Sequence, residues 1–319
     1  MATRRDVDVT DLISRARHAD PRAVARLISF VESDSPVLRE VAAGLVGAAG
    51  HAHVLGLTGS PGVGKSTTTN ALVSALRARG DRVGVLAVDP SSPFSGGALL
   101  GDRIRMAEHT ADDGVFIRSM ASRGQLGGLS AAVPQALRVL DAAGCDVILV
   151  ETVGVGQAEV EIASLADTTI LVLAPGLGDA IQAAKAGVVE IADVYAVNKA
   201  DRGGAEQVTR DLRQVQSMTA GRHEGWTAAI LKLSAASGEG VAELLAAIDA
   251  HRAWLGDSGE LAVRQQRRAA TEIEAIAVGE VRQRFAHVHG SDALDEAAAR
   301  VVAGESDPYT AAEALIAAL

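Results

Sequence analysis

The strongest constraint on this chain is a glycine-rich loop that joins an apolar run to a helix-prone segment, GLTGSPGVGKSTTTNALVSAL at residues 56–76. Gly59 is followed, after four residues, by Gly64, Lys65 and Ser66, which matches the phosphate-binding pattern in its strand-to-helix context. Glycines let backbone N–H groups turn inward around an anion, and the helix start adds partial positive charge. We expect a nucleoside triphosphate here, with Lys65 on the terminal phosphates and Ser66 on Mg²⁺. An ordinary glycine turn is the alternative.

Length and charge limit the classes of protein to which the chain can belong. Its 319 residues allow one large domain with extensions or two domains. A net charge of -10 offers no basic surface for nonspecific binding to a phosphate backbone, so we expect no nucleic-acid partner. Residues 1–20 lack the apolar core of a signal peptide, and no later run reaches the roughly 18 apolar residues of a membrane span. We therefore expect a cytoplasmic protein that binds no membrane.

Residues that commonly ligate metals are sparse. The single cysteine, Cys145, excludes an intramolecular disulfide and a multi-cysteine metal site. Because Cys145 begins an apolar run, we expect it to be buried rather than nucleophilic. His51 and His53 alternate along the first expected strand and point to the same face. We interpret this pair as structural, with a metal site as the alternative, because no further ligands accompany it.

The middle region, residues 51–256, determines the expected fold class. Nearly continuous apolar strands alternate here with helix-like segments, which is typical of a mostly parallel sheet covered by helices on both faces. In such α/β folds the ligand binds at the carboxyl ends of the strands. The seven expected strands are the runs HVLGLTG, RVGVLAVD, VFIRSM, DVILVET, TTILVLAP, VYAVNK and AILKLSA.

Helical extensions are expected on either side of this region. In residues 1–50, Asp20-Pro21 and Ser35-Pro36 each place a capping residue before a proline at the first helical position. Residues 257–319 carry no strand signal and end in the capped helix DPYTAAEALIAAL. The apolar residues expected on one side of the long C-terminal helix are Ile273, Ile276, Val281 and Phe285. Such an arm is either a lid on the sheet or a dimerisation element.

A second motif, AVNKAD at residues 196–201, indicates which base is bound. It ends an apolar strand and resembles the guanine-reading motif of GTPases. The carboxylate of Asp201 can accept hydrogen bonds from the guanine ring N–H and the 2-amino group, a donor pair that adenine lacks. The Ser-Ala-Ala turn at residues 234–236, at another strand end, supports this interpretation. The alternative for Asp201 is a solvated turn residue.

Two carboxylates at strand ends are candidates for organising Mg²⁺ and water. Asp89 follows GVLAV, and Glu151 follows DVILV. Each is alternatively a helix cap or a turn residue. Glu151 and Gly154 occupy the place where many GTPases have Asp-x-x-Gly, so that the Gly154 amide can sense the γ-phosphate. Gln157, which follows, is a candidate for positioning the attacking water.

Together these motifs resemble the class of phosphate-loop GTPases that mature metallocofactors. The resemblance is carried by Glu-x-x-Gly in place of Asp-x-x-Gly and by VDPSSP, GDRIRM and NKAD. Within that class, the chain closely resembles the MeaB-type chaperones of methylmalonyl-CoA mutase, relatives of the methylmalonic aciduria type A protein. Members have also been named arginine or ornithine (LAO/AO) transport kinases. The similarity covers nearly the whole chain, including both helical extensions.

The resemblance implies a role for each motif. Residues that would wrap the phosphates are Gly59, Ser60, Pro61, Gly62, Val63, Gly64, Lys65, Ser66 and Thr67. Residues that would hold guanine are Asn198, Lys199, Asp201, Ser234, Ala235 and Ala236. Residues that would organise Mg²⁺, directly or through waters, are Ser66, Asp89, Asp102 and Glu151, and the implied catalytic residues are Lys65, Asp89 and Glu151. Residues 177–190 would couple nucleotide state to the mutase, with Lys185 changing its ion pair or simply solvated.

The implied function is a GTPase chaperone that binds GTP, GDP and Mg²⁺ but not cobalamin. By the resemblance it would gate adenosylcobalamin loading into methylmalonyl-CoA mutase, protect and reactivate that enzyme, and form a homodimer through its C-terminal arm. Because no arginine finger is evident, we expect slow intrinsic hydrolysis that a partner accelerates by ordering the switch segments. The alternative function is a kinase that transfers the γ-phosphate to a small molecule or protein. Metal delivery is a third, disfavoured by the sparse cysteines and histidines.

Overall fold

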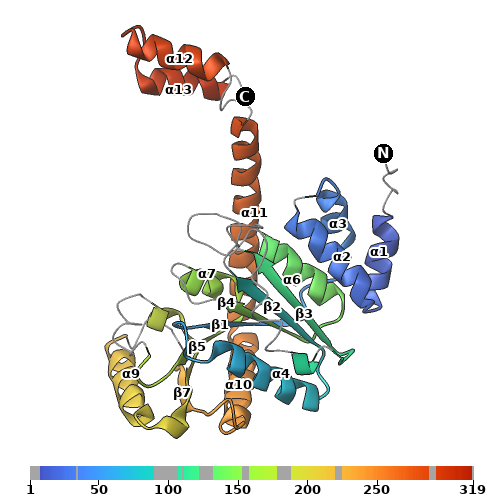
Figure 1. Cartoon of the computed structure of the whole chain (residues 1–319), viewed down its shortest axis with the longest axis vertical. Helices are drawn as coiled ribbons and strands as arrows, with labels where there is room; N and C mark the ends of the chain where they lie inside the picture. The colour runs from blue at the N-terminus through green and yellow to red at the C-terminus, as the bar shows by residue number, and fades with distance from the viewer. Residues whose placement is uncertain are drawn as a thin grey trace. The chain divides into compact units, whose positions relative to one another are not determined.

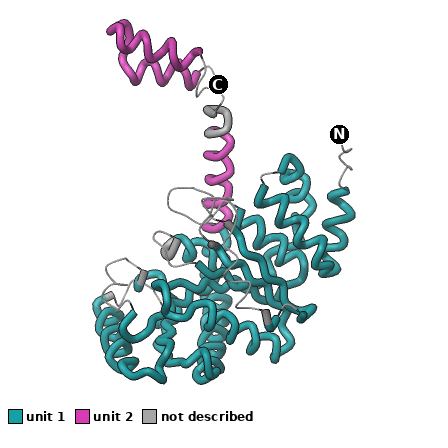
Figure 2. Tube along the Cα trace, in the orientation of Figure 1, with its two compact units in different colours: residues 1–266 teal, residues 267–319 magenta. Residues whose placement is uncertain are grey.

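The computed structural model describes residues 8–33, 35–89, 107–109, 111–121, 132–152, 158–177, 188–219, 225–286 and 292–317. By its internal contacts the chain divides into two compact units, residues 1–266 and residues 267–319 (Figure 2). The sheet belongs to the first unit, and the described part of the second is helical. The division into three parts after residues 50 and 256 stays a prediction.

All seven predicted strands form. They are β1 (His53–Thr58), β2 (Val83–Asp89), β3 (Val115–Ala121), β4 (Val147–Thr152), β5 (Thr168–Leu173), β6 (Val194–Val197) and β7 (Ala229–Lys232). They make one sheet in the order β3-β2-β4-β1-β5-β6-β7, and every neighbouring pair is parallel (Figure 1). This arrangement confirms the α/β class. It also brings the carboxyl ends of β1, β4, β5 and β6 to one edge of the sheet.

Helices cover both faces of the sheet, as predicted. One face packs against α4 (Lys65–Ala78) and α10 (Val241–Ser258). The other packs against α2 (Pro21–Glu32), α6 (Ala132–Ala142), α7 (Ala158–Leu165) and α9 (Ala205–Thr219). The remaining elements are α1 (Val9–Arg17), α3 (Leu38–Gly44), α11 (Glu260–Ala286), α12 (Asp292–Val302), α13 (Pro308–Ala317), η1 (Ala107–His109), η2 (Val188–Ile191) and η3 (Ala200–Arg202).

The N-terminal helices confirm one predicted cap and correct another. Asp20 caps α2, with Pro21 at the first helical position and the Asp20 carboxylate accepting the Arg22 amide. Ser35-Pro36, however, does not start a helix. α3 begins at Leu38 without a side-chain cap, and the Leu38 amide instead donates to the Ser35 carbonyl at 2.9 Å. The serine-proline pair therefore forms a turn, because its backbone bond is made before the helix begins.

Three strands are each preceded by an aspartate that bonds to the backbone of the neighbouring strand. Each carboxylate accepts the backbone N–H of a residue at the start of the neighbouring strand, at 2.8 to 2.9 Å. The bonds join Asp146 to the Arg82 amide, Asp167 to the Val54 amide and Asp193 to the Thr169 amide. Amides at the beginning of a strand need partners when they are buried. These aspartates therefore fix the register at the amino edge of the sheet.

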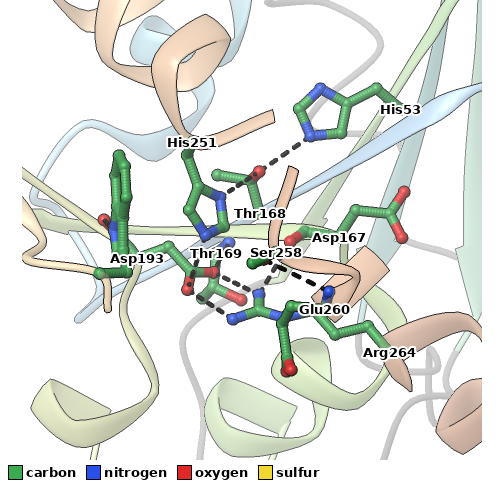
Figure 3. Close-up of polar contacts among 10 residues, drawn as sticks. His53, Asp167, Thr168, Thr169, Asp193, His251, Ser258, Glu260 and Arg264 are labelled. Carbon is green, nitrogen blue, oxygen red and sulfur yellow. Dashed lines mark hydrogen bonds and ion pairs between the residues drawn. The ribbon is translucent and has the colours of Figure 1, made fainter. Parts of the chain in front are cut away.

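Asp193 also anchors the helices that leave the sheet (Figure 3). The guanidinium of Arg264, in the first turns of α11, donates to both carboxylate oxygens of Asp193 at 2.8 and 2.9 Å. The Trp226 indole donates to the Asp193 carbonyl at 2.9 Å. Burial alone would raise the pKa of Asp193, but hydrogen bonds from His251 and Arg264 outweigh it and lower the pKa to about 2. The carboxylate is thus a charged, buried anchor for the start of α11.

A chain of polar side chains runs from Asp193 back to β1 (Figure 3). Nε2 of His251 lies 3.3 Å from Oδ1 of Asp193, and Nδ1 of His251 lies 2.8 Å from the Thr168 hydroxyl. That hydroxyl is in turn 2.8 Å from Nε2 of His53. The rings of Trp226 and Trp254 lie 4.7 and 5.5 Å from the His251 ring. His53 is therefore a buried structural residue, as expected, but His51 precedes β1 and is exposed, so the two histidines do not alternate along the strand.

The second unit contains the later part of α11 together with α12 and α13. Asp307 caps α13 by accepting the Tyr309 and Thr310 amides, which confirms the predicted capped helix. Ile273, Ile276 and Val281 are exposed. The side chain of Phe285 lies outside the described residues. Among the helices in the described ranges, none has the length and apolar character needed to span a membrane.

The buried His53 predicts a pH dependence of stability. Burial, aided by the charge of Arg252, lowers the pKa of His53 from 6.5 to about 3. The native imidazole therefore stays neutral while the unfolded one gains a proton below pH 6.5, so the native state loses stability as pH falls from 6.5 towards 3. Between pH 7.5 and 5.0 this group alone should cost about 2 kcal/mol. Urea unfolding followed by tryptophan fluorescence at both pH values measures the loss.

His53→Gln keeps a neutral polar side chain at this position and should lose less stability over the same pH range than the unmodified protein. His51→Gln, at the exposed neighbour, is the matched control and should behave like the unmodified protein. An equal loss in the His53→Gln and unmodified proteins would contradict the assignment.

Candidate functional site

The glycine-rich loop takes a backbone conformation that requires glycine. Between β1 and α4, Gly59, Gly62 and Gly64 have φ angles of 139°, 81° and 99°, in the region that favours glycine. A Cβ on Gly59 would lie 2.1 Å from the Val172 carbonyl oxygen. A Cβ on Gly64 would lie 2.3 Å from the Asn198 side-chain nitrogen. The loop is therefore closely packed against the ends of β5 and β6.

Lys65 places a buried positive charge beside this loop. It is the first residue of α4, and its Nζ donates to the carbonyls of Gly59 and Ser60 at 2.7 and 3.2 Å. The partial positive charge of the helix start adds to that of the ammonium group. The loop, the ammonium group and the helix start therefore combine into a site that can attract an anion.

A carboxylate faces the start of α4 from the sheet. Glu151, buried at the end of β4, accepts the Ser66 hydroxyl on Oε1 at 2.6 Å and the Thr69 hydroxyl on Oε2 at 2.9 Å. Oxygen donors of this kind suit Mg²⁺, which needs only one or two protein carboxylates together with phosphate oxygens and water. The described residues contain no group of three or more histidine, cysteine, aspartate or glutamate side chains placed to hold a metal. Ser66 and Glu151 fit the smaller requirement of Mg²⁺.

Thr69 is a residue of this site that our sequence analysis missed. It lies three positions after Ser66 on α4, so both hydroxyls project from the same side of the helix. That spacing is the signal in the sequence that could have identified it. The apolar pattern of a helix, however, does not distinguish a threonine that bonds to a site residue from one that only packs in the core.

Asn198 joins the glycine-rich loop to the turn after β7. Its Nδ2 donates to the Val63 carbonyl at 2.9 Å, and its Oδ1 accepts the Ala235 amide at 3.0 Å. The next residue, Lys199, has a left-handed backbone with φ of 57°, and its Nζ donates to the Gly62 carbonyl at 2.6 Å. Both side chains therefore contact the phosphate loop from the motif at the end of β6.

Asp201 lies beside these contacts and faces solvent. It belongs to η3, and its side chain is 53% exposed. The Ala200 amide donates to the Leu233 carbonyl at 3.1 Å, which brings the motif next to the turn after β7. In that turn Ser234 and Ala235 are buried and Ala236 is exposed. An exposed carboxylate next to two turn segments can accept hydrogen bonds from a planar ligand.

Several predicted site residues lie outside the part that the structure describes. Asp89 ends β2, where its backbone pairs with Ala121 of β3, but its side chain is outside the described residues. Residues that lie wholly outside are Asp102, Gly154, Gln157 and Lys185. The same holds for residues 178–187 of the predicted coupling segment.

Cys145, in contrast, is described, and burial raises the pKa of its thiol to about 12. It is therefore buried and not thiolate at neutral pH, as expected.

Asn198→Ala should weaken both the fold and the site. The substitution leaves the Val63 carbonyl and the Ala235 amide unpaired in a buried place, which should lower the free energy of unfolding by about 2 to 4 kcal/mol. The affinity for a nucleotide should fall by at least about tenfold. Urea unfolding and equilibrium titration with nucleotide measure the two effects.

Gln216→Ala is the matched control, because Nε2 of Gln216 donates to the Ala228 carbonyl at 2.8 Å, outside the site. This control should lose stability but keep its nucleotide affinity. An unchanged nucleotide affinity in Asn198→Ala would contradict the role of Asn198 in holding the phosphate loop to the turn after β7.

Comparisons with known proteins place the chain among GTPases. Residues 24–289 match the family model described as methylmalonyl-CoA mutase-associated GTPase MeaB. A protein of Pyrococcus horikoshii named as a candidate GTPase is 46% identical over 311 residues, 97% of each chain. The mouse methylmalonic aciduria type A homolog is 38% identical over 215 residues, 66% of this chain and 52% of that one.

A solved structure has the same fold over nearly the whole chain. The crystal structure of an LAO/AO transport system kinase matches 96% of both chains with a TM-score of 0.72 and 27% identity. The family match covers most of the chain, and its phosphate loop follows β1 as in P-loop nucleotide triphosphatases. This chain therefore belongs to the MeaB family of P-loop GTPases.

Proposed function

We propose that the site at the carboxyl edge of the sheet binds GTP and GDP with Mg²⁺ and that its residues carry the GTPase reaction of the family. The observation that supports this most directly is Asn198, which bonds to the phosphate loop and to the turn after β7 together. The phosphate-binding and base-binding motifs are thereby held next to each other. A single nucleotide can contact both.

The phosphates bind to the loop from Gly59 to Thr67. Its positive-φ glycines turn backbone amides towards the ligand, and the start of α4 supplies further donors. The Lys65 ammonium moves from the loop carbonyls to the β- and γ-phosphates, a short displacement for a flexible side chain. This exchange replaces neutral acceptors by charged ones and so strengthens the contact.

Guanine binds at the end of β6. The Asp201 carboxylate accepts the ring N–H and the 2-amino group, while Asn198, Lys199 and the turn at residues 234–236 form the surrounding walls. An adenine base would leave the carboxylate facing an acceptor, so it is rejected. The exposure of Asp201 keeps the carboxylate accessible to the incoming base.

Hydrolysis needs a water in line with the γ-phosphate and neutralisation of the charge that develops. Ser66 would hold Mg²⁺, with Glu151, Asp89 and Asp102 organising it, and the ion would supply part of that neutralisation when bound. Lys65 supplies the rest from the loop, and Glu151 orients the Ser66 hydroxyl by accepting its hydrogen bond. Gln157 and the Gly154 amide are the proposed partners of the water and the γ-phosphate.

The client that we propose is adenosylcobalamin-dependent methylmalonyl-CoA mutase. The family description names association with that enzyme, and the mouse relative is named for methylmalonic aciduria. GTP turnover would gate adenosylcobalamin loading and protect or reactivate the mutase, with residues 177–190, including Lys185, as the coupling segment. This chain would act in the cytoplasm as a homodimer joined through its C-terminal helices, without binding cobalamin itself.

GTP hydrolysis by the purified chain, with and without methylmalonyl-CoA mutase from the same organism, tests the proposal. The mutase should stimulate phosphate release. Lys65→Ala should abolish most of that release, because the part of the γ-phosphate charge that Lys65 neutralises is left uncompensated; a loss of about a hundredfold or more is expected. Asp201→Asn should weaken GTP binding and favour xanthosine triphosphate, whose 2-oxo group accepts the hydrogen bond that asparagine can donate.

Candidate acceptors added to the same assay separate hydrolysis from phosphoryl transfer. Phosphate recovered on an acceptor rather than in solution would replace the proposal by a kinase. Hydrolysis that is fast without mutase and unchanged by it would contradict the coupling. An unrelated cobalamin-dependent mutase serves as the control for specificity.

A further inference from the structure

Glu151 is held by two hydroxyls of α4, each on its own carboxylate oxygen. The Ser66 hydroxyl bonds to Oε1 at 2.6 Å, and the Thr69 hydroxyl bonds to Oε2 at 2.9 Å. All three side chains are buried, with Thr69 fully so. One helix, α4, therefore bonds to both oxygens of the carboxylate at the end of β4.

Two bonds matter because one cannot fix a carboxylate. The last torsion of a glutamate side chain is broad, so a carboxylate bonded through one oxygen still rotates about it. A bond to the second oxygen removes this freedom. Glutamate is also one methylene longer than the aspartate found at this position in many GTPases, so it has one more torsion to restrain.

The backbone of Lys65 orients the Thr69 hydroxyl in advance. The same hydroxyl lies 3.1 Å from the Lys65 carbonyl oxygen, one helical turn earlier, so its single proton is shared between that carbonyl and Oε2 of Glu151. In a helix a threonine is divided between two rotamers, and a bond to the carbonyl four residues back selects one of them. Here the selected rotamer also faces Glu151. Little side-chain entropy is then lost when Thr69 holds the carboxylate, because the backbone has already chosen the rotamer.

We propose that Thr69 is a positioning residue for Mg²⁺ in the GTPase reaction, acting through Glu151. The proposal rests on the proposed function of the site. The Ser66 hydroxyl donates a hydrogen bond to Oε1, so the direction of the lone pairs that it would offer to a cation depends on where Oε1 lies. Thr69 holds Oε2 and thereby sets the position of Oε1. The geometry that Ser66 offers to a cation therefore depends on a residue that does not touch the cation.

Thr68 provides a matched control for this proposal. It is also fully buried in α4, and its hydroxyl also bonds to a carbonyl four residues back, that of Gly64 at 3.0 Å. In the described hydrogen bonds it does not contact Glu151. Thr68→Val and Thr69→Val therefore remove the same kind of hydroxyl from adjacent buried positions, and only the second removes a hydrogen bond to Oε2 of Glu151.

The test compares Thr69→Val, Thr69→Ser and Thr68→Val with the unmodified protein in two assays. The first measures kcat and KM for GTP hydrolysis against Mg²⁺ concentration. The second measures how strongly Mg²⁺ slows the release of a fluorescent GDP, which needs no hydrolysis. Losing a partner that orients a metal ligand typically costs about 10-fold to 100-fold in metal affinity or activity. Thr69→Val should show that loss in kcat and in the Mg²⁺ dependence of GDP release.

GDP release without Mg²⁺ should stay unchanged in Thr69→Val, because the phosphate and base contacts remain. Thr69→Ser keeps the hydroxyl and should recover most of the lost Mg²⁺ dependence. Thr68→Val should remain close to the unmodified protein in both assays. If Thr69→Val does not fold by circular dichroism, Thr69→Cys, whose thiol donates only weakly, takes its place and should show the same loss.

Thr69→Val with an unchanged Mg²⁺ dependence would overturn the proposal, as would an equal effect in Thr68→Val or a failure of serine to restore the dependence. In each of these results the unmodified protein still hydrolyses GTP, so the proposed function survives. An unmodified protein that neither hydrolyses GTP nor responds to Mg²⁺ would instead overturn both.

Discussion

The buried side-chain amide of Asn198 is the interaction on which the site depends most. One side of the amide bonds to the Val63 carbonyl in the phosphate loop, and the other bonds to the Ala235 amide after β7. The three segments that meet at Asn198 follow β1, β6 and β7, and they come together because β1, β5, β6 and β7 are consecutive strands of one parallel sheet. A buried amide left half-satisfied would be costly, so these segments hold one another in a single arrangement.

The two edges of the sheet use polar residues for different purposes. At the amino edge, aspartates pair with strand amides, and Asp193 with Arg264 fixes the start of α11. Asp167 and Asp193 are buried, and their bonds to strand amides stabilise the fold. At the carboxyl edge, Lys65 and Glu151 have partners that a nucleotide and its cation can exchange or share. The amino edge therefore makes the scaffold rigid, and the carboxyl edge keeps groups available for chemistry.

Much of this arrangement could be predicted from sequence, because its signals are local. The seven strands are short apolar runs, and the phosphate loop and NKAD motif are contiguous. The failures also have physical causes. Ser35-Pro36 has the composition of a helix start but closes a turn first. Thr69 and the contacts between His251, Thr168 and His53 depend on side chains that meet across the fold, and no periodicity within one segment reports such a meeting.

One site is proposed to hold both the phosphates and a guanine base. Isothermal titration calorimetry with GDP and with ADP, both in the presence of Mg²⁺, tests it most directly, because the two ligands carry the same diphosphate and differ in the base. GDP should bind at least about a hundredfold more tightly than ADP, since adenine cannot satisfy Asp201. Equal affinity for the two nucleotides would contradict it, because the phosphate loop would then be binding without the motif at the end of β6.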